Sequence, residues 1–168
     1  MAKRRKQIVI DVPVGDSDGP VRPGRSTPAT APAYRVKAVI RRDSRYLLAQ
    51  HNNRRPETQG KWTFLGGLID PDDASPSQAL VRELWEELRV TGRVVGEVGQ
   101  FPYEDNPGPC VVLLADFEGE PRPNEEILAL RWYTREEVEA LGRAGLLQMG
   151  LELEAIAQAE RMVALNAG

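Results

Sequence analysis

Hydrophobic residues along this chain follow two spacings, one typical of β-strands and one typical of amphipathic helices. Five β-rich segments form two predicted hairpins and one later strand: 34–40 with 46–50, 93–103 with 110–117, and 127–133. Asp43 and Ser44 supply a turn in the first hairpin, because short polar residues tolerate the backbone angles of tight turns. These segments predict the strands of a central β-sheet.

Helical spacing appears in three segments, two of them near the C-terminus. Thr134 with Glu137 forms a capping-box pattern and opens a short helix, which Gly142 and Gly145 are expected to break. A last helix is predicted over 146–165. Its aliphatic residues suit packing on the sheet, and a dimer contact is the alternative use.

The first predicted helix carries three carboxylates on one face. Its start is marked by three residues: the N-cap Ser75, Pro76 and Gln78. At about 100° per residue, Glu83, Glu86 and Glu87 point the same way. The opposite side is predicted to face the core through five apolar residues: Leu80, Val81, Leu84, Trp85 and Leu88. Like charges repel by roughly 0.2–0.5 kcal/mol per pair on an exposed helix, and a hard divalent cation would reverse that penalty. The alternative is an ordinary solvated acidic face.

The first 33 residues differ in composition from the rest. Residues 7–12 are β-rich and predict a short strand, whereas residues 13–33 hold five prolines and three glycines among small polar residues. Proline and glycine at that density predict an irregular connector. The sequence therefore predicts an N-terminal arm and connector over 1–33 and one folded domain over 34–168.

Composition excludes several classes of protein. Cys110 is the only cysteine, so no internal disulfide is possible, and it is expected to be a small core residue in a reducing cytosol. His51 is the only histidine, which leaves a zinc site without support. No apolar run approaches the roughly 20 residues that span a bilayer. The basic residues at the start are not followed by the apolar segment that a secretory signal peptide requires. We therefore expect a cytoplasmic protein with no membrane partner.

Charge is distributed unevenly along the chain. Residues 1–45 hold 11 Lys and Arg against 4 acids, whereas residues 46–168 hold 11 against 21. The basic segment over 3–6 is expected to be a solvated terminus, with contact to nucleic acid or another polyanion as the alternative. Because no aromatic residues interleave with these charges, nucleic acid is the less favoured partner. A homodimer, in which the N-terminal arm pairs with a neighbouring subunit, stays open.

The segment from Gly67 to Val90 resembles the Nudix box, the motif of the Nudix hydrolases. Gly67 takes its first position, the run Arg82-Glu83-Leu84-Trp85-Glu86-Glu87 fits its catalytic segment without a gap, and Val90 takes its last position. The chain departs from the motif at three places: Asp73 replaces the first glutamate, Ala74 is inserted, and Arg89 replaces the closing glycine. Arginine at a helix C′ position bears strain, unless Gly92 supplies the turn instead. Asp73 is expected to support the loop or an outer-sphere water.

This resemblance implies a fold, a reaction and a metal. The fold is an α/β (α+β) chain, a Nudix-like α/β/α sandwich around a mixed β-sheet. The reaction is Mg²⁺-dependent hydrolysis of the pyrophosphate bond of a nucleoside diphosphate linked to another moiety, with Mn²⁺ as a substitute. The metal is assigned to Glu83, Glu86 and Glu87, with a backbone carbonyl of Gly66 or Gly67.

Two further roles follow from the resemblance. Arg82 is expected to pair with Glu86 at i,i+4 and to hold that carboxylate in place. The general base stays open between Glu83, Glu87 and Glu126, the last of which resembles a remote acid that some family members supply from a later loop.

Substrate contacts are expected before and after the box. Residues 61–65 resemble the strand that leads into the glycines, and Arg54 or Arg55 in the preceding loop would meet a phosphate. Ordinary surface charge is the alternative for these arginines. Three aromatic residues are candidate base-stacking surfaces, with core packing as the alternative: Trp62, Phe64 and Tyr103.

Two other functions stay open beside hydrolysis. One is a non-catalytic Nudix-like module that binds a nucleotide or a protein, which the altered box favours and the intact glutamates disfavour. The other is RNA-end processing, which rests only on the basic start. The box does not identify the nucleotide, which is a nucleoside triphosphate, a nucleotide sugar or a similar compound.

Overall fold

The computed structural model describes residues 33–53, 55–103 and 108–168. The strand predicted over 7–12 and nearly all of the predicted connector over 13–33 lie outside these residues. The division of the chain into an N-terminal arm and a folded domain therefore stays a prediction.

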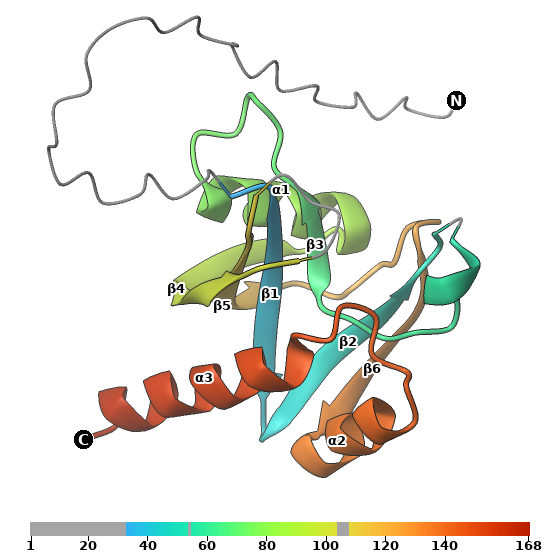
Figure 1. The fold of residues 1–168 in the computed structure, drawn as a ribbon. Helices are drawn as coiled ribbons and strands as arrows, with labels where there is room; N and C mark the ends of the chain where they lie inside the picture. The colour runs from blue at the N-terminus through green and yellow to red at the C-terminus, as the bar shows by residue number, and fades with distance from the viewer. Residues whose placement is uncertain (1–32, 54, 104–107) are drawn as a thin grey trace, which may run out of the picture.

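A mixed six-stranded β-sheet forms the centre of the protein (Figure 1). Its strands are β1 (Arg35–Arg42), β2 (Arg45–His51), β3 (Leu65–Leu68), β4 (Thr91–Phe101), β5 (Cys110–Glu118) and β6 (Ile127–Thr134). Their order is β4-β5-β1-β2-β6, and β3 also pairs with β1. β1 runs parallel to β5, and the other pairs are antiparallel. Both predicted hairpins and the later strand are confirmed.

Helices cover both faces of this sheet (Figure 1). They are α1 (Pro76–Leu88), α2 (Arg135–Arg143) and α3 (Glu152–Asn166), with a 3-10 turn at Pro56–Thr58. Leu84 of α1 packs in one core with Val36 and Ala38, whereas Ile156 of α3 packs in a second core with Val39. Neighbouring residues of β1 point to opposite faces of the sheet, so the two helices lie on opposite sides and the predicted sandwich is confirmed. No helix in the described ranges is long and apolar enough to cross a membrane.

The turn between β1 and β2 consists of Asp43 and Ser44, as predicted. Both have positive φ angles, of 48° and 59°. Two consecutive positive φ angles are typical of the two-residue turns whose twist matches that of the strands they join. This turn brings the start of β2 back along β1.

The glycine pair lies inside a strand, and the bounds predicted for that strand, 61–65, are wrong. The residues before Leu65 form only isolated bridges, and β3 covers Leu65–Leu68. Gly66 has a φ of +123°, and a Cβ there would lie 2.2 Å from the carbonyl oxygen of Val36. Glycine therefore lets β3 approach β1 at this point, where a side chain would collide with the backbone.

Two predicted helix bounds also differ from the structure. α2 continues through Gly142, and its end is followed by Gly145 at a φ of +71°. α3 begins at Glu152 instead of residue 146, because the preceding residues pair with a different segment: the N–H of Trp62 donates to the carbonyl of Leu146 at 2.8 Å. The residues between the helices therefore form turns and bends, with a single bridge between Leu147 and Trp62.

α1 ends at Arg89, which has left-handed backbone angles (φ 58°, ψ 34°) and whose N–H donates to the carbonyl of Trp85 at 2.9 Å. Gly92 does not supply this turn. It lies in β4, where a Cβ would lie 2.7 Å from Cδ1 of Leu84. The strain expected for arginine at this position is therefore present, and it amounts to about 1–2 kcal/mol for a residue with a Cβ.

Replacing Arg89 by glycine is expected to stabilise the domain, because glycine adopts these angles freely. The free energy of unfolding should rise by about 1 kcal/mol, which corresponds to about 2–4 °C in melting temperature for a domain of this size. Arg89→Ala is the matched control, since it keeps the Cβ and also removes the guanidinium that lies 5.7 Å from the Trp85 ring. A glycine variant that melts no higher than the alanine variant would contradict the strain assigned to Arg89.

Candidate active site

The three predicted carboxylates of α1 lie in two different environments. Glu83 and Glu87 are buried, with exposed fractions of 8% and 2%, whereas the side chain of Glu86 is 49% exposed. The alternative interpretation, a solvated acidic face, therefore applies only to Glu86. Burying two carboxylates side by side is unfavourable unless they have partners, so the groups around them decide what this site does.

The predicted core stripe of α1 is correct at three of its five positions. Leu80, Leu84 and Leu88 are fully buried, but Val81 is 37% exposed and Trp85 is 53% exposed. The prediction was wrong for Val81 and Trp85 because α1 packs on the sheet through the leucines and the side of the helix that carries Glu83 and Glu87. The two glutamates, and not Val81 and Trp85, are therefore turned toward β3.

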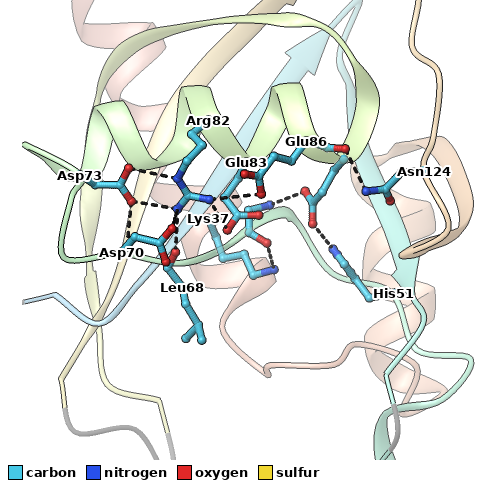
Figure 2. A network of polar contacts seen from close by, with 11 residues as sticks. Lys37, His51, Leu68, Asp70, Asp73, Arg82, Glu83, Glu86 and Asn124 are labelled. Atoms are coloured by element: carbon cyan, nitrogen blue, oxygen red, sulfur yellow. Dashed lines mark hydrogen bonds and ion pairs between the residues drawn. The ribbon is translucent and has the colours of Figure 1, made fainter. Parts of the chain in front are cut away.

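Glu87 is held by groups from two strands, and one of these groups is His51, labelled in Figure 2. Its Oε2 accepts the N–H of Gly66 at 3.1 Å, and its Oε1 lies 3.2 Å from Nε2 of His51 at the end of β2. Lys37 of β1, which is 3% exposed, donates from Nζ to the carbonyls of Gly66 and Phe64 at 3.0 Å each. These contacts join α1 to β1, β2 and β3 and fix the position of the Glu87 carboxylate.

Burial dominates the titration of these groups. Burial, followed by the charge of Glu87, raises the pKa of Glu83 to about 7 against the opposing charge of Arg82. Burial lowers the pKa of Lys37, and the charge of Glu87 opposes this change. Burial and the positive charge of Lys37 lower the pKa of His51, so its imidazole is neutral at pH 7. Because Glu83 and Glu87 repel each other in a buried site, binding of a proton or a cation by these carboxylates is favourable.

The residues around Glu83 suit a hard divalent cation. A Cβ at Gly67 would lie 2.7 Å from Oε1 of Glu83, so glycine makes room for this carboxylate. All candidate ligands are oxygens, which Mg²⁺ and Mn²⁺ prefer. As they stand, no three acidic, histidine or cysteine side chains in the described ranges are grouped closely enough to hold an ion. Arg82 pairs with both Glu83 and Glu86, at 3.2 and 3.3 Å. Metal ligation by the glutamates and Gly67 therefore stays a prediction.

A loop between β5 and β6 closes over the C-terminal end of α1. Asn124 donates from its side chain to the carbonyl of Glu86 at 2.9 Å and from its backbone N–H to the carbonyl of Glu87 at 2.8 Å. Its side-chain oxygen accepts the N–H of Glu126 at 2.9 Å. The charge of Glu126 acts to raise the pKa of His51. The predicted remote acid thus lies near the histidine that contacts Glu87.

A pocket of about 440 Å³ contains two of the predicted substrate contacts, Arg55 and Tyr103. Its full lining is Arg55, Phe101, Pro102, Tyr103, Gln148, Met149, Gly150, Leu151 and Glu154. The guanidinium of Arg35 lies 5.7 Å from the ring of Tyr103. Arg35 and Lys37 alternate on β1 and share one face of the sheet, so this strand connects the pocket with the acidic network.

The remaining predicted contacts lie in other surroundings. Trp62 packs edge-on against Tyr133, with ring centroids 5.0 Å apart, as part of the core beneath α3. Phe64 is fully buried, which confirms core packing for this residue. Arg54 lies outside the described residues.

Comparison with known proteins identifies the family. The family model described as NUDIX domain matches residues 31–149. The chain belongs to the Nudix family. The CTP pyrophosphohydrolase of Escherichia coli (strain K12) is 40% identical over 106 residues, which cover 61% of this chain and 76% of that relative. The NAD-capped RNA hydrolase NudC of Photorhabdus laumondii is 33% identical over 111 residues, which cover 65% of this chain and 41% of that relative.

Solved structures agree with this assignment. The solution structure of the E. coli ORF135 protein is similar with 34% sequence identity and a TM-score of 0.55, over 79% of this chain and 89% of that one. A UDP-X diphosphatase has a TM-score of 0.65 at 18% identity, over 84% and 68% of the two chains, and shows the shared fold. As a Nudix protein, the chain is a hydrolase of phosphoanhydride bonds in nucleoside diphosphate-linked compounds, and Nudix hydrolases generally need a divalent metal.

Arg82 organises the Nudix box in this chain (Figure 2). It donates to both carboxylate oxygens of Asp73 at 3.0 and 2.8 Å, and the expected pairing with Glu86 is present. Asp73 also accepts the N–H of Asp70 at 2.8 Å, and its hydrogen bonds with Arg82 lower its pKa. The aspartate that replaces the first glutamate of the box therefore supports the loop, as expected.

Three residues of this network were not predicted as site residues: Lys37, His51 and Asn124. Lys37 interrupts the apolar run of its strand. A single charged residue within a predicted buried strand could have marked it as a candidate site residue. His51 was considered only as a zinc ligand. Asn124 has no distinctive signal, because its role depends on where its loop meets α1.

The raised pKa of Glu83 predicts how stability depends on pH in the absence of metal. Its pKa is about 7 in the folded protein against an ordinary value of 4.5, so its contribution to stability is complete below pH 4.5 and is lost as the pH rises through 7. Relative to Glu83→Gln, the free energy of unfolding of the wild type should fall by roughly 2–3 kcal/mol between pH 5 and pH 8.

Urea denaturation of both proteins with EDTA at pH 5, 6, 7 and 8 measures this difference. Because the wild type and the variant share every other titrating group, those groups cancel in the comparison. Parallel pH profiles would show that Glu83 titrates normally and that its burial has no electrostatic consequence.

Proposed function

We propose that this chain is a Mg²⁺-dependent pyrophosphohydrolase of nucleoside triphosphates, with Mn²⁺ as a working substitute and cytidine nucleotides as its preferred substrates. The observation that carries the proposal is the pair of buried carboxylates, Glu83 and Glu87, packed against the glycine strand. Such a pair favours a divalent cation, and cleavage of a phosphoanhydride is the chemistry for which that cation is needed.

Hydrolysis of a phosphoanhydride needs charge neutralisation, an aligned water and a leaving phosphate. When bound, Mg²⁺ would neutralise charge on the diphosphate oxygens and lower the pKa of a water molecule. Glu83, Glu86 and Glu87 would hold it, with a backbone carbonyl of Gly67. Arg82 keeps two of these carboxylates in position through its contacts of 3.2 and 3.3 Å.

We assign proton transfer from the attacking water to Glu126, with Glu83 and Glu87 as the alternatives. Glu126 comes from a loop that Asn124 anchors to the end of α1, so it approaches from a different element than the other acids. Its charge reaches His51, which contacts Glu87. A base outside the metal-holding set accepts the proton while the other acids hold the ion.

The pocket supports a nucleoside as part of the substrate. Tyr103 offers aromatic surface for stacking, and Gln148 and Arg55 offer hydrogen bonds. Arg35 over Tyr103 adds a cation suited to phosphate. The relative that is 40% identical is named a CTP pyrophosphohydrolase, which favours a cytidine triphosphate for this chain as well.

A non-catalytic binding module is the second candidate, since the box is altered at Asp73 and Arg89. Both alterations are accommodated, because Asp73 keeps its pairing with Arg82 and Arg89 only ends the helix. A cytoplasmic location is supported by Cys110, a buried free thiol. A homodimer stays a proposal that the size of the protein in solution tests.

Glu87→Gln is expected to remove most Mg²⁺-dependent turnover without unfolding the protein. A glutamine oxygen still accepts from Gly66, and the amide group donates to Nε2 of His51 once the imidazole carries its proton on Nδ1, so both contacts are retained while the negative charge is lost. The turnover number should fall by at least about 10²-fold. Glu118→Gln at the exposed end of β5 is the matched control and should be unchanged. Near-normal rates in Glu87→Gln would refute the metal role of this residue.

A nucleotide panel tests the substrate assignment. CTP, UTP, ATP, ADP-ribose and a UDP-sugar are assayed with Mg²⁺, with Mn²⁺ and with EDTA. We expect the highest kcat/KM for CTP, release of CMP and pyrophosphate, and no turnover in EDTA. Cleavage of only ADP-ribose or the UDP-sugar would reject the triphosphate substrate, and tight binding without cleavage would favour the binding module.

A further inference from the structure

β4 is the outermost strand on one side of the central sheet (Figure 1). Among the residues that the structure describes, β5 is its only strand partner, so the backbone groups on its other side face outward along 11 residues. A long open edge is a template for pairing with a further strand, and proteins protect such edges by bulges, charges or a covering segment. The register of β4 shifts between Val94 and Gly96 and between Glu97 and Gly99, which leaves its first part, Thr91–Val94, regular and open to pairing.

The regular part of β4 lies beside exposed apolar side chains of α1. A Cβ on Gly92 would lie 3.6 Å from Cα of Val81, so this flank of the helix borders the strand. Val81 is 37% exposed, and Trp85, one turn later on the same flank, is 53% exposed. We call these two residues the outer flank of α1. Apolar side chains gathered beside an open strand edge are typical of a surface that another segment covers.

Residues 7–12, which lie outside the described residues, have a sequence that matches this surface. They read Gln-Ile-Val-Ile-Asp-Val, which is rich in β-branched residues. Because successive side chains of a strand point to opposite faces, a strand over these residues has Ile8, Ile10 and Val12 on one face. An entirely apolar face suits packing on the outer flank of α1 while the backbone pairs with β4.

The connector is long enough to bring this segment to β4 of the same chain. The N–H of Tyr34 donates to the carbonyl of Pro109 at 3.0 Å, and the residue after Pro109 pairs with Phe101 at the end of β4. Since β4 is 11 residues long, its first residue lies about 34 Å from that end. The 20 residues from 13 to 32 extend to about 66 Å, which exceeds the distance they need to cover.

We propose that residues 7–12 form a strand that pairs with Thr91–Val94 of the same chain and covers the outer flank of α1. Residues 46–168 hold 21 acids against 11 Lys and Arg, and this excess of negative charge attracts the basic segment over 3–6 toward the domain. The occupant of this surface is then the N-terminal arm of the chain itself, and not a second copy or another protein. The arm protects the only regular part of an otherwise bulged edge.

The experiment is amide hydrogen exchange of the full chain, measured residue by residue by NMR, with light scattering for the molecular mass. One variant combines Ile8→Asp and Ile10→Asp, which places charges on the face that packs on α1. Val9→Asp is the matched control, because it places the same charge on the other face of the same segment. A second double variant, Val81→Ser with Trp85→Gln, removes the surface from the domain side. Circular dichroism of each variant checks the fold, and the arm variants decide if the α1 variant does not fold.

We expect the amides of Thr91–Val94 that point away from β5 to be protected in a monomeric wild type. Both double variants should exchange these amides at least about 10-fold faster, and Val9→Asp should match the wild type. Equal exchange rates in the wild type and the arm double variant would overturn the docking of the arm, as would a Val9→Asp variant that exchanges as fast as the double variant. Protection that is present only in a dimer would assign the surface to a second copy and overturn docking within one chain.

Discussion

The close approach of β1 and β3 at Gly66 is the constraint on which the active site depends. With no Cβ at this position, the carbonyl of Val36 lies where a side chain would otherwise be. The N–H of Gly66 is then directed at Glu87 and its carbonyl at Lys37. Because β1 lies in the middle of the sheet, between β5 and β2, the central strands and not a surface loop set the position of Glu87.

Opposite charges around Glu83 and Glu87 explain how the domain tolerates two buried carboxylates. Glu83 and Glu87 are compensated by two cations, Arg82 from the same helix and Lys37 from the opposite strand. The compensation is incomplete at Glu83, whose pKa rises to about 7 in the folded protein. A carboxyl group such as Glu83, whose pKa lies near 7, can release its proton when a metal ion binds near neutral pH.

Local chemistry in the sequence was enough to predict most elements of this fold. Ser75 caps α1 as expected, and Thr134 with Glu137 caps α2, because these signals act within one turn of helix. Asp43 and Ser44 form their turn for the same reason. The Nudix box then supplied the family and, through it, the sandwich architecture.

What sequence reasoning missed depends on contacts between distant segments. The flank of α1 that faces the sheet is set by the path of β3 and β4, so Trp85 was assigned to the core although it is exposed. Lys37 joins the site only because β1 pairs with β3, 27 to 29 residues away along the chain. No periodicity within one element reports such a pairing, and Asn124 depends on a loop closure of the same kind.

The pocket has a different origin from the acidic network. It is lined mostly by connecting residues: Arg55, the two residues after Phe101, and those from Gln148 to Leu151. Apart from the core residues Phe101 and Leu151, few of these residues belong to the central strands or the core, so replacing them should have little effect on stability. In the proposed nucleoside site, substitutions at these positions would therefore change nucleoside preference while the carboxylates of α1 keep their places on the sheet.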